Sequence, residues 1–350
     1  MKKIISLLIS IIIITSCFTG CKTKSNKYTD YSFNYFDTVT TIVGFEETES
    51  EFKNNCTKIK EQLEIYHKLY NIYSTYDDIR NICNINQHSD DKVSLSVDKK
   101  IIDLLQFSKD MHTLTNGKVN IAMGSVLSIW HQYREEGLNN PQNAKLPSVD
   151  LLKNANEHTD IDNIIINDVN NTIKILDKKL KLDVGGIAKG YAVEQTALWM
   201  KEQGYNGYLL NVGGNIRIIG KRTDGEKWKV GIENPDTNDT ETPYIEYLKL
   251  DDMSLVTSGS YQRFYTVDNV NYHHIIDPDT LMPSDYFASV SVLCKDSGKA
   301  DAFSTALFSM SHKDGEKLVN KNNDIEVMWV FKNGEKKYSK GFKDYCYKTD

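Results

Sequence analysis

A double glycine between a β-like run and a helical pattern is the sequence feature that most constrains the structure and the ligand of this chain. Apolar residues alternate up to Leu182, Asp183 follows, and Gly185-Gly186 leads into a helical pattern that begins at Ile187. Glycines at a strand-to-helix turn let the backbone approach a ligand, and the helix N-terminus offers unpaired N–H groups to a phosphate. Lys189 adds a cation on the helix side of the turn. The alternative is a tight structural turn capped by Asp183, since the segment lacks the GxxxxGK[ST] pattern of a P-loop.

Length and charge narrow the class of protein. The 350 residues suffice for one large or two ordinary domains, and the 40% hydrophobic content is enough for a core. The formal net charge is −6, so the chain lacks the excess of basic residues that is typical of nucleic-acid-binding proteins. We therefore expect no nucleic-acid partner.

The N-terminus has the pattern of an export signal. A basic start precedes an apolar run from Ile4 to Ile14, which is too short for a comfortable membrane span. Cys17 and Cys21 follow small residues, as in a bacterial lipobox, where the cysteine is lipidated. We predict that residues 1–21 are a lipoprotein signal peptide, with Cys21 or Cys17 lipidated at the extracytoplasmic face of the cell membrane. The polar residues 22–33 are predicted to be a flexible tether. An ordinary cleaved signal peptide is the alternative, and it also places the protein outside the cytoplasm.

The remaining four cysteines do not indicate a metal site. Cys56, Cys83, Cys294 and Cys346 show no CxxC spacing and no accompanying histidine cluster. We expect free thiols that are mostly buried.

Periodicity predicts a single domain over residues 34–350 in which helices and hairpins are interleaved. Helices are expected over 50–72, 97–114 with Asp98 as N-cap, about 187–203 and about 299–310. Strands are expected over 34–43, 164–166, 173–175, 208–212, 228–232, 244–250 and 289–293. The strands over 164–166 and 173–175 should form a hairpin around Asn170-Asn171, and a last hairpin should turn at Asn333-Gly334. This order favours an α+β fold of mixed helices and antiparallel sheets over a repeated βαβ unit.

Three further segments carry side chains suited to chemistry. His273 and His274 precede Ile275-Ile276-Asp277-Pro278, and a histidine there could move protons, although a structural role is the alternative. Asp301 and Thr305 share one helix face and could offer two hard oxygens to Mg²⁺, or Asp301 could simply cap the helix. The run from Val256 to Arg263 reads as a hydroxyl-rich turn whose arginine could meet a phosphate or remain solvated.

Taken together and in order, these segments resemble the ApbE family of FAD:protein FMN transferases. The resemblance rests on LDVGGIAKGYAV, NVGGNI, VTSGSYQRF, HHIIDP and ADAFSTA, and covers nearly all of the chain after Asp37-Thr38. It implies a flavin cleft between sheet-based subdomains, FAD as substrate and Mg²⁺ as cofactor. It further implies transfer of FMN to a threonine of an acceptor protein, such as a flavin-bearing membrane redox subunit or an FMN-binding domain, with release of AMP. Two alternatives remain: an FAD pyrophosphatase that gives FMN and AMP, and a lipoprotein that only binds flavin.

The resemblance also implies roles for individual residues. The metal ligands would be the Gly186 carbonyl, Asp301 and Thr305. The general base would be His274, with Asp183 as the second candidate. Contacts with FAD would come from Phe36, Tyr76, Gly117, Lys118, Val119, Asp183, Lys189 and Ile275. The chain departs from the family pattern at Phe36-Asp37-Thr38, at 117–122 and at 277–281, and these departures affect the flavin pocket rather than the metal ligands.

Overall fold

The computed structural model describes residues 25–89, 93–261 and 263–348. The strands are β1(Asn26–Tyr35), β2(Thr38–Glu46), β3(Leu95–Ser96), β4(Ile164–Asn167), β5(Thr172–Ile175), β6(Tyr208–Val212), β7(Asn215–Ile219), β8(Trp228–Glu233), β9(Tyr244–Leu250), β10(Ser254–Gly259), β11(Phe264–Val267), β12(Val270–His273), β13(Ser289–Cys294), β14(Ile325–Val330) and β15(Lys336–Tyr338). The helices are α2(Glu49–Leu69), α3(Ile82–Gln87), α4(Lys99–Leu114), α5(Gly124–Asn139), α6(Val149–Asn156), α7(Ala188–Glu202), α8(Ser297–Phe308) and α9(His312–Val319). Short 3-10 helices lie at η3(Pro141–Asn143), η4(Ile161–Asn163) and η5(Phe342–Tyr345). No helix of this described part is long and apolar enough to cross a membrane.

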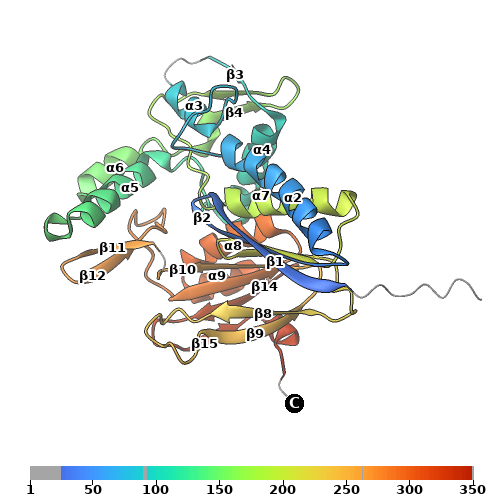
Figure 1. Cartoon of the computed structure of the whole chain (residues 1–350). Helices are drawn as coiled ribbons and strands as arrows, with labels where there is room; N and C mark the ends of the chain where they lie inside the picture. Colours follow the sequence, from blue (N-terminus) through green and yellow to red (C-terminus); the bar gives the residue numbers. More distant parts are fainter. Residues whose placement is uncertain (1–24, 90–92, 262, 349–350) are drawn as a thin grey trace, which may run out of the picture.

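An eight-stranded antiparallel sheet forms the centre of the molecule (Figure 1). Its strand order is β1-β2-β6-β7-β10-β13-β14-β15, so β1 and β15 are its edges. Helices α2, α7 and α8 pack on one face, and the β8–β9 hairpin covers part of the other. Neighbouring residues of β10 show this division, because Leu255 lies in the core under the hairpin and Val256 in the core under α8. The predicted α+β class with antiparallel sheets is confirmed.

Most predicted elements are present where the periodicity placed them. The helices expected over 50–72 and 97–114 correspond to α2 and α4, and Asp98 caps α4 by accepting from the Lys100 amide at 2.8 Å. The hairpins around Asn170-Asn171 and Asn333-Gly334 are also found. The described cysteines are free thiols, and all but Cys346 are buried, as expected.

The N-terminal prediction is wrong from Asn26 onward. Residues 26–33, predicted as part of the tether, instead belong to β1, which pairs with β2 from Asn26↔Glu46 to Tyr35↔Thr38. The single strand expected over 34–43 is instead interrupted by a tight turn, in which Phe36 and Asp37 have φ values of 54° and 50°. An edge strand exposes one side and one face to water, so its sequence can be as polar as that of a loop. The predicted signal peptide and lipidation site lie outside the described residues.

Two other expectations differ from the structure. The hydroxyl-rich run that begins at Val256 is not a turn up to Gly259, because it lies within the central strand β10. Its hydroxyls face partners across the sheet and on α8: Ser258 and Ser304 are joined by a 2.9 Å hydrogen bond. Helix α5 was not anticipated, since it buries only the narrow stripe Gly124, Val126, Trp130 and Gly137.

Helices α7 and α8 pack closely against each other at Gly190. A methyl group on this residue would lie 2.4 Å from the Ser297 carbonyl oxygen and 2.4 Å from Cβ of Asp301. The glycine is therefore required by packing rather than by backbone conformation, and it determines how near Asp301 comes to the start of α7.

Gly190→Ala is expected to destabilise the protein by about 1–3 kcal/mol, because the helices must move apart. Alanine's better helix propensity, worth about 1 kcal/mol, offsets only part of this cost. Urea unfolding measures the effect. Gly315→Ala in α9 is the matched control, because its new methyl would meet the movable end of Leu307 at 3.2 Å. Equal stabilities of the two variants would contradict the packing argument.

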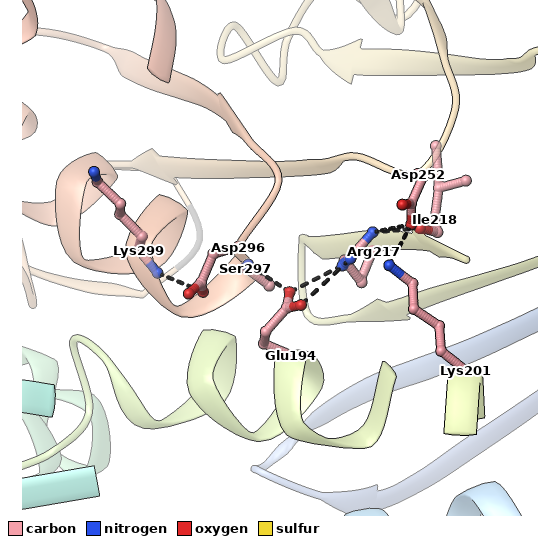
Figure 2. Close-up of polar contacts among 8 residues, drawn as sticks. All are labelled: Glu194, Lys201, Arg217, Ile218, Asp252, Asp296, Ser297 and Lys299. Atoms are coloured by element: carbon pink, nitrogen blue, oxygen red, sulfur yellow. Dashed lines mark hydrogen bonds and ion pairs between the residues drawn. The ribbon is translucent and has the colours of Figure 1, made fainter. Parts of the chain in front are cut away.

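A buried ionic network joins α7, β7 and the start of α8 (Figure 2). Glu194 Oε2 accepts hydrogen bonds from Arg217 Nε at 2.9 Å and from the Ser297 amide at 2.8 Å. Arg217 also donates to Asp252 at 3.1 Å, and Asp252 pairs with Lys201 at 2.6 Å nearer the surface. Because the Ser297 amide belongs to the first turn of α8, the network holds the helix that carries Asp301 against α7.

Candidate active site

A cavity of about 270 Å³ lies where the helix layer meets the β11–β12 hairpin and α5. Its walls come from parts of the chain far apart in sequence, including the turn before α7, the end of β10 and one face of α8. Nine of the twelve residues to which the resemblance assigns a role in the site line it: Lys118, Val119, Asp183, Gly186, Lys189, His274, Ile275, Asp301 and Thr305.

The three oxygens predicted to hold a metal are brought together. The Thr305 hydroxyl lies 3.4 Å from the Gly186 carbonyl oxygen, and Asp301 is one helical turn before Thr305. Asp301 is only 5% exposed, and its Oδ2 accepts from the Gly190 amide at 2.8 Å and from Asn215 Nδ2 at 3.2 Å. Its Oδ1 has no hydrogen-bond partner among the described residues. Burial raises the pKa of this carboxyl group, although the nearby charge of Lys189 opposes the rise.

This donor set fits a hard divalent cation. A carboxylate, a hydroxyl and a backbone carbonyl are the oxygen ligands that Mg²⁺ accepts, with phosphate oxygens completing the shell. A cation would also compensate the buried carboxylate, which otherwise lacks a full partner. The described residues contain no group of three or more His, Cys, Asp or Glu side chains that could hold a metal. A metal at this position must therefore rely on the Gly186 carbonyl and the Thr305 hydroxyl.

Asp183 shapes the turn that presents Gly186. Its Oδ1 accepts from the Gly185 amide at 2.8 Å, and its own amide donates to the Ile121 carbonyl at 2.8 Å. Desolvation raises the pKa of Asp183, against the Gly185 hydrogen bond and the charges of His131 and Arg134. Helix α7 begins after Ile187 without a side-chain cap, so Asp183 stabilises the turn and does not cap the helix.

The adjacent histidines have different surroundings. His273 is buried, its Nε2 lies 2.7 Å from the Ser284 carbonyl oxygen, and its Nδ1 accepts from the Ile275 amide at 3.2 Å. Both ring nitrogens are therefore occupied in structural bonds. His274 Nδ1 lies 3.3 Å from the Arg263 carbonyl oxygen, which can only accept, so Nδ1 carries the proton and Nε2 is left to accept one. Desolvation, with the charge of Arg263, lowers the pKa of His274.

Lys118 lines the cavity but is engaged in ion pairs. Its Nζ lies 2.6 Å from Asp277 and 2.8 Å from Asp279. Burial disfavours the charge on Lys118, but the hydrogen bonds to these two carboxylates outweigh it and raise the pKa. This pair joins two segments where the chain departs from the family pattern.

Three predicted FAD contacts lie outside the lining of this cavity. Phe36 packs edge-on against His67 at a ring distance of 5.5 Å, and the Tyr76 hydroxyl accepts from Asn71 at 3.2 Å. Gly117, with φ +81°, terminates α4 by donating its amide to the His112 carbonyl. Their contact with FAD stays a prediction.

Sequence reasoning missed a group at the α5 side of the cavity. Tyr73, Trp130, His131 and Arg134 line it, and Arg134 Nη2 bonds to His131 Nδ1 at 2.8 Å while the rings of His131 and Tyr73 are 5.1 Å apart. Three of them lie on α5, so prediction of that helix would have been needed to find them. Arg263, named as a possible phosphate contact, also lines the cavity and donates to the Asp37 carbonyl at 3.0 Å.

Comparison with known proteins identifies the family. The model of the ApbE family matches residues 32–329. The chain belongs to the ApbE family. It is 29% identical to the FAD:protein FMN transferase of Vibrio cholerae over 274 residues, 78% of this chain and 77% of the relative. It is 26% identical to that of Haemophilus influenzae over 335 residues, 92% of each chain.

Solved structures of ApbE proteins share the fold. The ApbE protein of Thermotoga maritima superposes with a TM-score of 0.80 at 28% identity, covering 92% of this chain and all of that one. The flavin transferase ApbE of Vibrio cholerae gives a TM-score of 0.76 at 25% identity, covering 92% and 99%. The predicted family, fold and enzyme class, a transferase, are thereby confirmed.

Proposed function

We propose that this ApbE-family chain transfers FMN from FAD to a threonine hydroxyl of an acceptor protein, releases AMP, and requires Mg²⁺. The observation that carries the proposal is the meeting of the Gly186 carbonyl, Asp301 and Thr305 in one cavity with His274. Curated relatives that carry the name FAD:protein FMN transferase support the same reaction.

In this proposal, different residues of the cavity hold the metal ion and accept the proton. Gly186, Asp301 and Thr305 would hold Mg²⁺, which when bound neutralises charge on the pyrophosphate of FAD. His274 Nε2 accepts the proton of the acceptor hydroxyl, whose oxygen bonds to the FMN-side phosphorus as the bond to the AMP phosphate breaks. Asp183 is the second candidate for the base, because its raised pKa brings a carboxyl group nearer to neutral pH.

Mass spectrometry of a candidate acceptor protein after incubation with this protein, FAD and Mg²⁺ tests the reaction. A mass increase equal to one FMN, dependent on one threonine, is expected. AMP release without modification of any acceptor would instead indicate FAD pyrophosphatase activity.

His274→Ala is expected to lower turnover by about 10²–10⁴ with a much smaller effect on FAD affinity, since a base acts in the transition state. His273→Ala is the neighbouring control: it leaves the buried Ser284 carbonyl unpaired, so it should cost about 1–3 kcal/mol of stability rather than turnover. Steady-state kinetics and urea unfolding of both variants separate these roles. A loss confined to FAD binding in His274→Ala would contradict the assignment.

The acid limb of the pH–rate profile is expected below the ordinary histidine pKa of about 6.5. The pKa of His274 is lowered in the folded protein, so the imidazole stays neutral and able to accept a proton until the pH falls below that value. Burial lowers the pKa of His274 to about 3, so the dependence of kcat/KM on pH, followed from about pH 8 down to about pH 3, reports this group in the free enzyme. An acid limb centred above 6.5 would show that another group acts as the base.

We further propose that the protein is held at the extracytoplasmic face of the cell membrane by lipidation of Cys21 or Cys17. The support is the sequence pattern of residues 1–21 alone. Membrane fractionation of Cys21→Ala and Cys17→Ala, with mass spectrometry of the N-terminal peptide, tests it. A soluble product from one variant identifies the lipidated cysteine.

A further inference from the structure

Strand β1 leaves an aromatic face open at the edge of the large sheet. Tyr31 is 61% exposed and Phe33 73%, and both lie on the side away from α2, against which Ser32 and Tyr35 are buried. Phe33 lies at the register shift opposite Val39 of β2, which is itself 44% exposed. We call Tyr31, Phe33 and Val39 the β1 face. Adjacent exposed apolar residues of this size are typical of an interaction surface.

The rest of the same sheet face is covered. Phe45, opposite Lys27, packs edge-on against Trp228 of β8 at a ring distance of 5.5 Å. The β8–β9 hairpin thus shields the part of the sheet near the beginning of β1, and the open part lies toward the turn at Phe36-Asp37. In Figure 1, β1 runs along the edge of the sheet, below α2.

The chain before β1 limits what this face can meet. If Cys21 carries the lipid, only the four residues from Lys22 to Ser25 separate it from Asn26. Five residue steps reach at most about 17 Å when extended, so the edge of the folded domain is held close to the lipid headgroups. The long tether expected from the sequence would have allowed free tumbling, whereas the observed start of β1 does not.

The residue types at and just before β1 also suit contact with the lipid headgroup layer. Aromatic side chains are preferred at the membrane–water interface. Lys22 and Lys24 come shortly before the strand in sequence and Lys27 is its second residue, although the chain as a whole has a net charge of −6. Juxtamembrane lysines are attracted to anionic lipids by about 1 kcal/mol each. The unpaired N–H and C=O groups of an edge strand keep the strand out of the hydrocarbon core, where they would have no partner. At the membrane surface, water and lipid headgroups can satisfy them.

We infer that the β1 face docks on the surface of the bilayer, so that β1 lies along the membrane. This inference rests on the lipid anchor proposed above. Because β1 leads into the turn before Thr38, which lines the cavity, such docking holds the cavity near the membrane surface. A membrane-bound acceptor could then present its threonine without leaving the bilayer.

Hydrogen exchange of the full lipidated chain in liposomes of equal parts phosphatidylglycerol and phosphatidylcholine tests the docking. Peptides covering β1 are expected to exchange at least about fivefold more slowly in the wild type than in Tyr31→Ser/Phe33→Ser. The control is Tyr244→Ser/Tyr286→Ser, which removes two tyrosines that are each 42% exposed elsewhere, and it should behave as wild type. Tyr31→Trp/Phe33→Trp should restore slow exchange, which a general weakening of the strand would not predict. Peptides covering β15, the other edge, should exchange equally in all four chains.

The same variants distinguish docking on the membrane from binding of the acceptor protein or of a second copy at the β1 face. Transfer of FMN to a soluble acceptor should be unchanged in Tyr31→Ser/Phe33→Ser, and sedimentation in detergent should give one mass for all variants. A specific loss of transfer would assign the face to the acceptor, and a change in mass would assign it to a second copy; either result overturns the inference. Equal exchange of wild type and double variant in liposomes also overturns it. Absence of transfer in the wild type would instead reject the proposed function, and absence of a lipid would reject the anchor.

Discussion

Asp301→Asn will abolish Mg²⁺-dependent FMN transfer, with an expected loss of about 10³-fold or more in kcat/KM. Removing one electrostatic partner of a transition state typically costs 10²–10³, and a metal ligand supports several such contacts at once. Asparagine keeps the shape and can still accept from the Gly190 amide, but it lacks the negative charge that the cation requires. Thr305→Val should be milder, because a neutral hydroxyl is a weaker ligand than a carboxylate.

Two measurements besides activity make this prediction specific. Isothermal titration with Mg²⁺ or Mn²⁺ should show weakened binding in Asp301→Asn. Urea unfolding near neutral pH should show stability equal to or above that of the wild type. The pKa of Asp301 is raised by burial, so its ionised form opposes folding above the ordinary carboxyl range, and this penalty disappears as the pH falls into that range. Wild-type turnover of the variant at limiting Mg²⁺ would reject the metal assignment.

Arg217→Met is expected to destabilise the protein by about 3–5 kcal/mol. It leaves the buried carboxylate of Glu194 without its guanidinium, and an unpaired buried charge is strongly unfavourable. The double variant Glu194→Gln/Arg217→Met should recover part of the loss, because the charge is removed together with its partner and an amide oxygen remains for the Ser297 amide. The network lies between α7 and α8, so the destabilised variant should also bind the metal less tightly.

Urea unfolding of the two single variants and the double variant gives the coupling energy of the pair. Lys201→Met is the control at the outer end of the same network, where partly exposed pairs contribute about 1 kcal/mol or less. If Arg217→Met cost no more than Lys201→Met, the buried pair would not be what holds α8 in place.

The sequence alone determined the elements whose signals are local. Turn residues such as Asn333-Gly334 and Asn170-Asn171, the Asp98 cap and the apolar period of α2 and α4 depend on neighbours a few residues away. The ordered motifs also identified the family and named Asp301, Thr305 and His274 as candidate site residues, because each motif keeps its polar side chains in one short segment.

The tertiary structure decided what depends on contacts across the chain. Whether residues 26–33 form a tether or a strand depends on the partner that β2 supplies, since a polar edge strand and a polar loop have similar sequences. The different surroundings of His273 and His274 arise from the carbonyl oxygens of Ser284 and Arg263, which lie 11 residues from each histidine. The need for glycine at 190 likewise appears only when α8 is packed against α7, because no local pattern records how closely two helices approach.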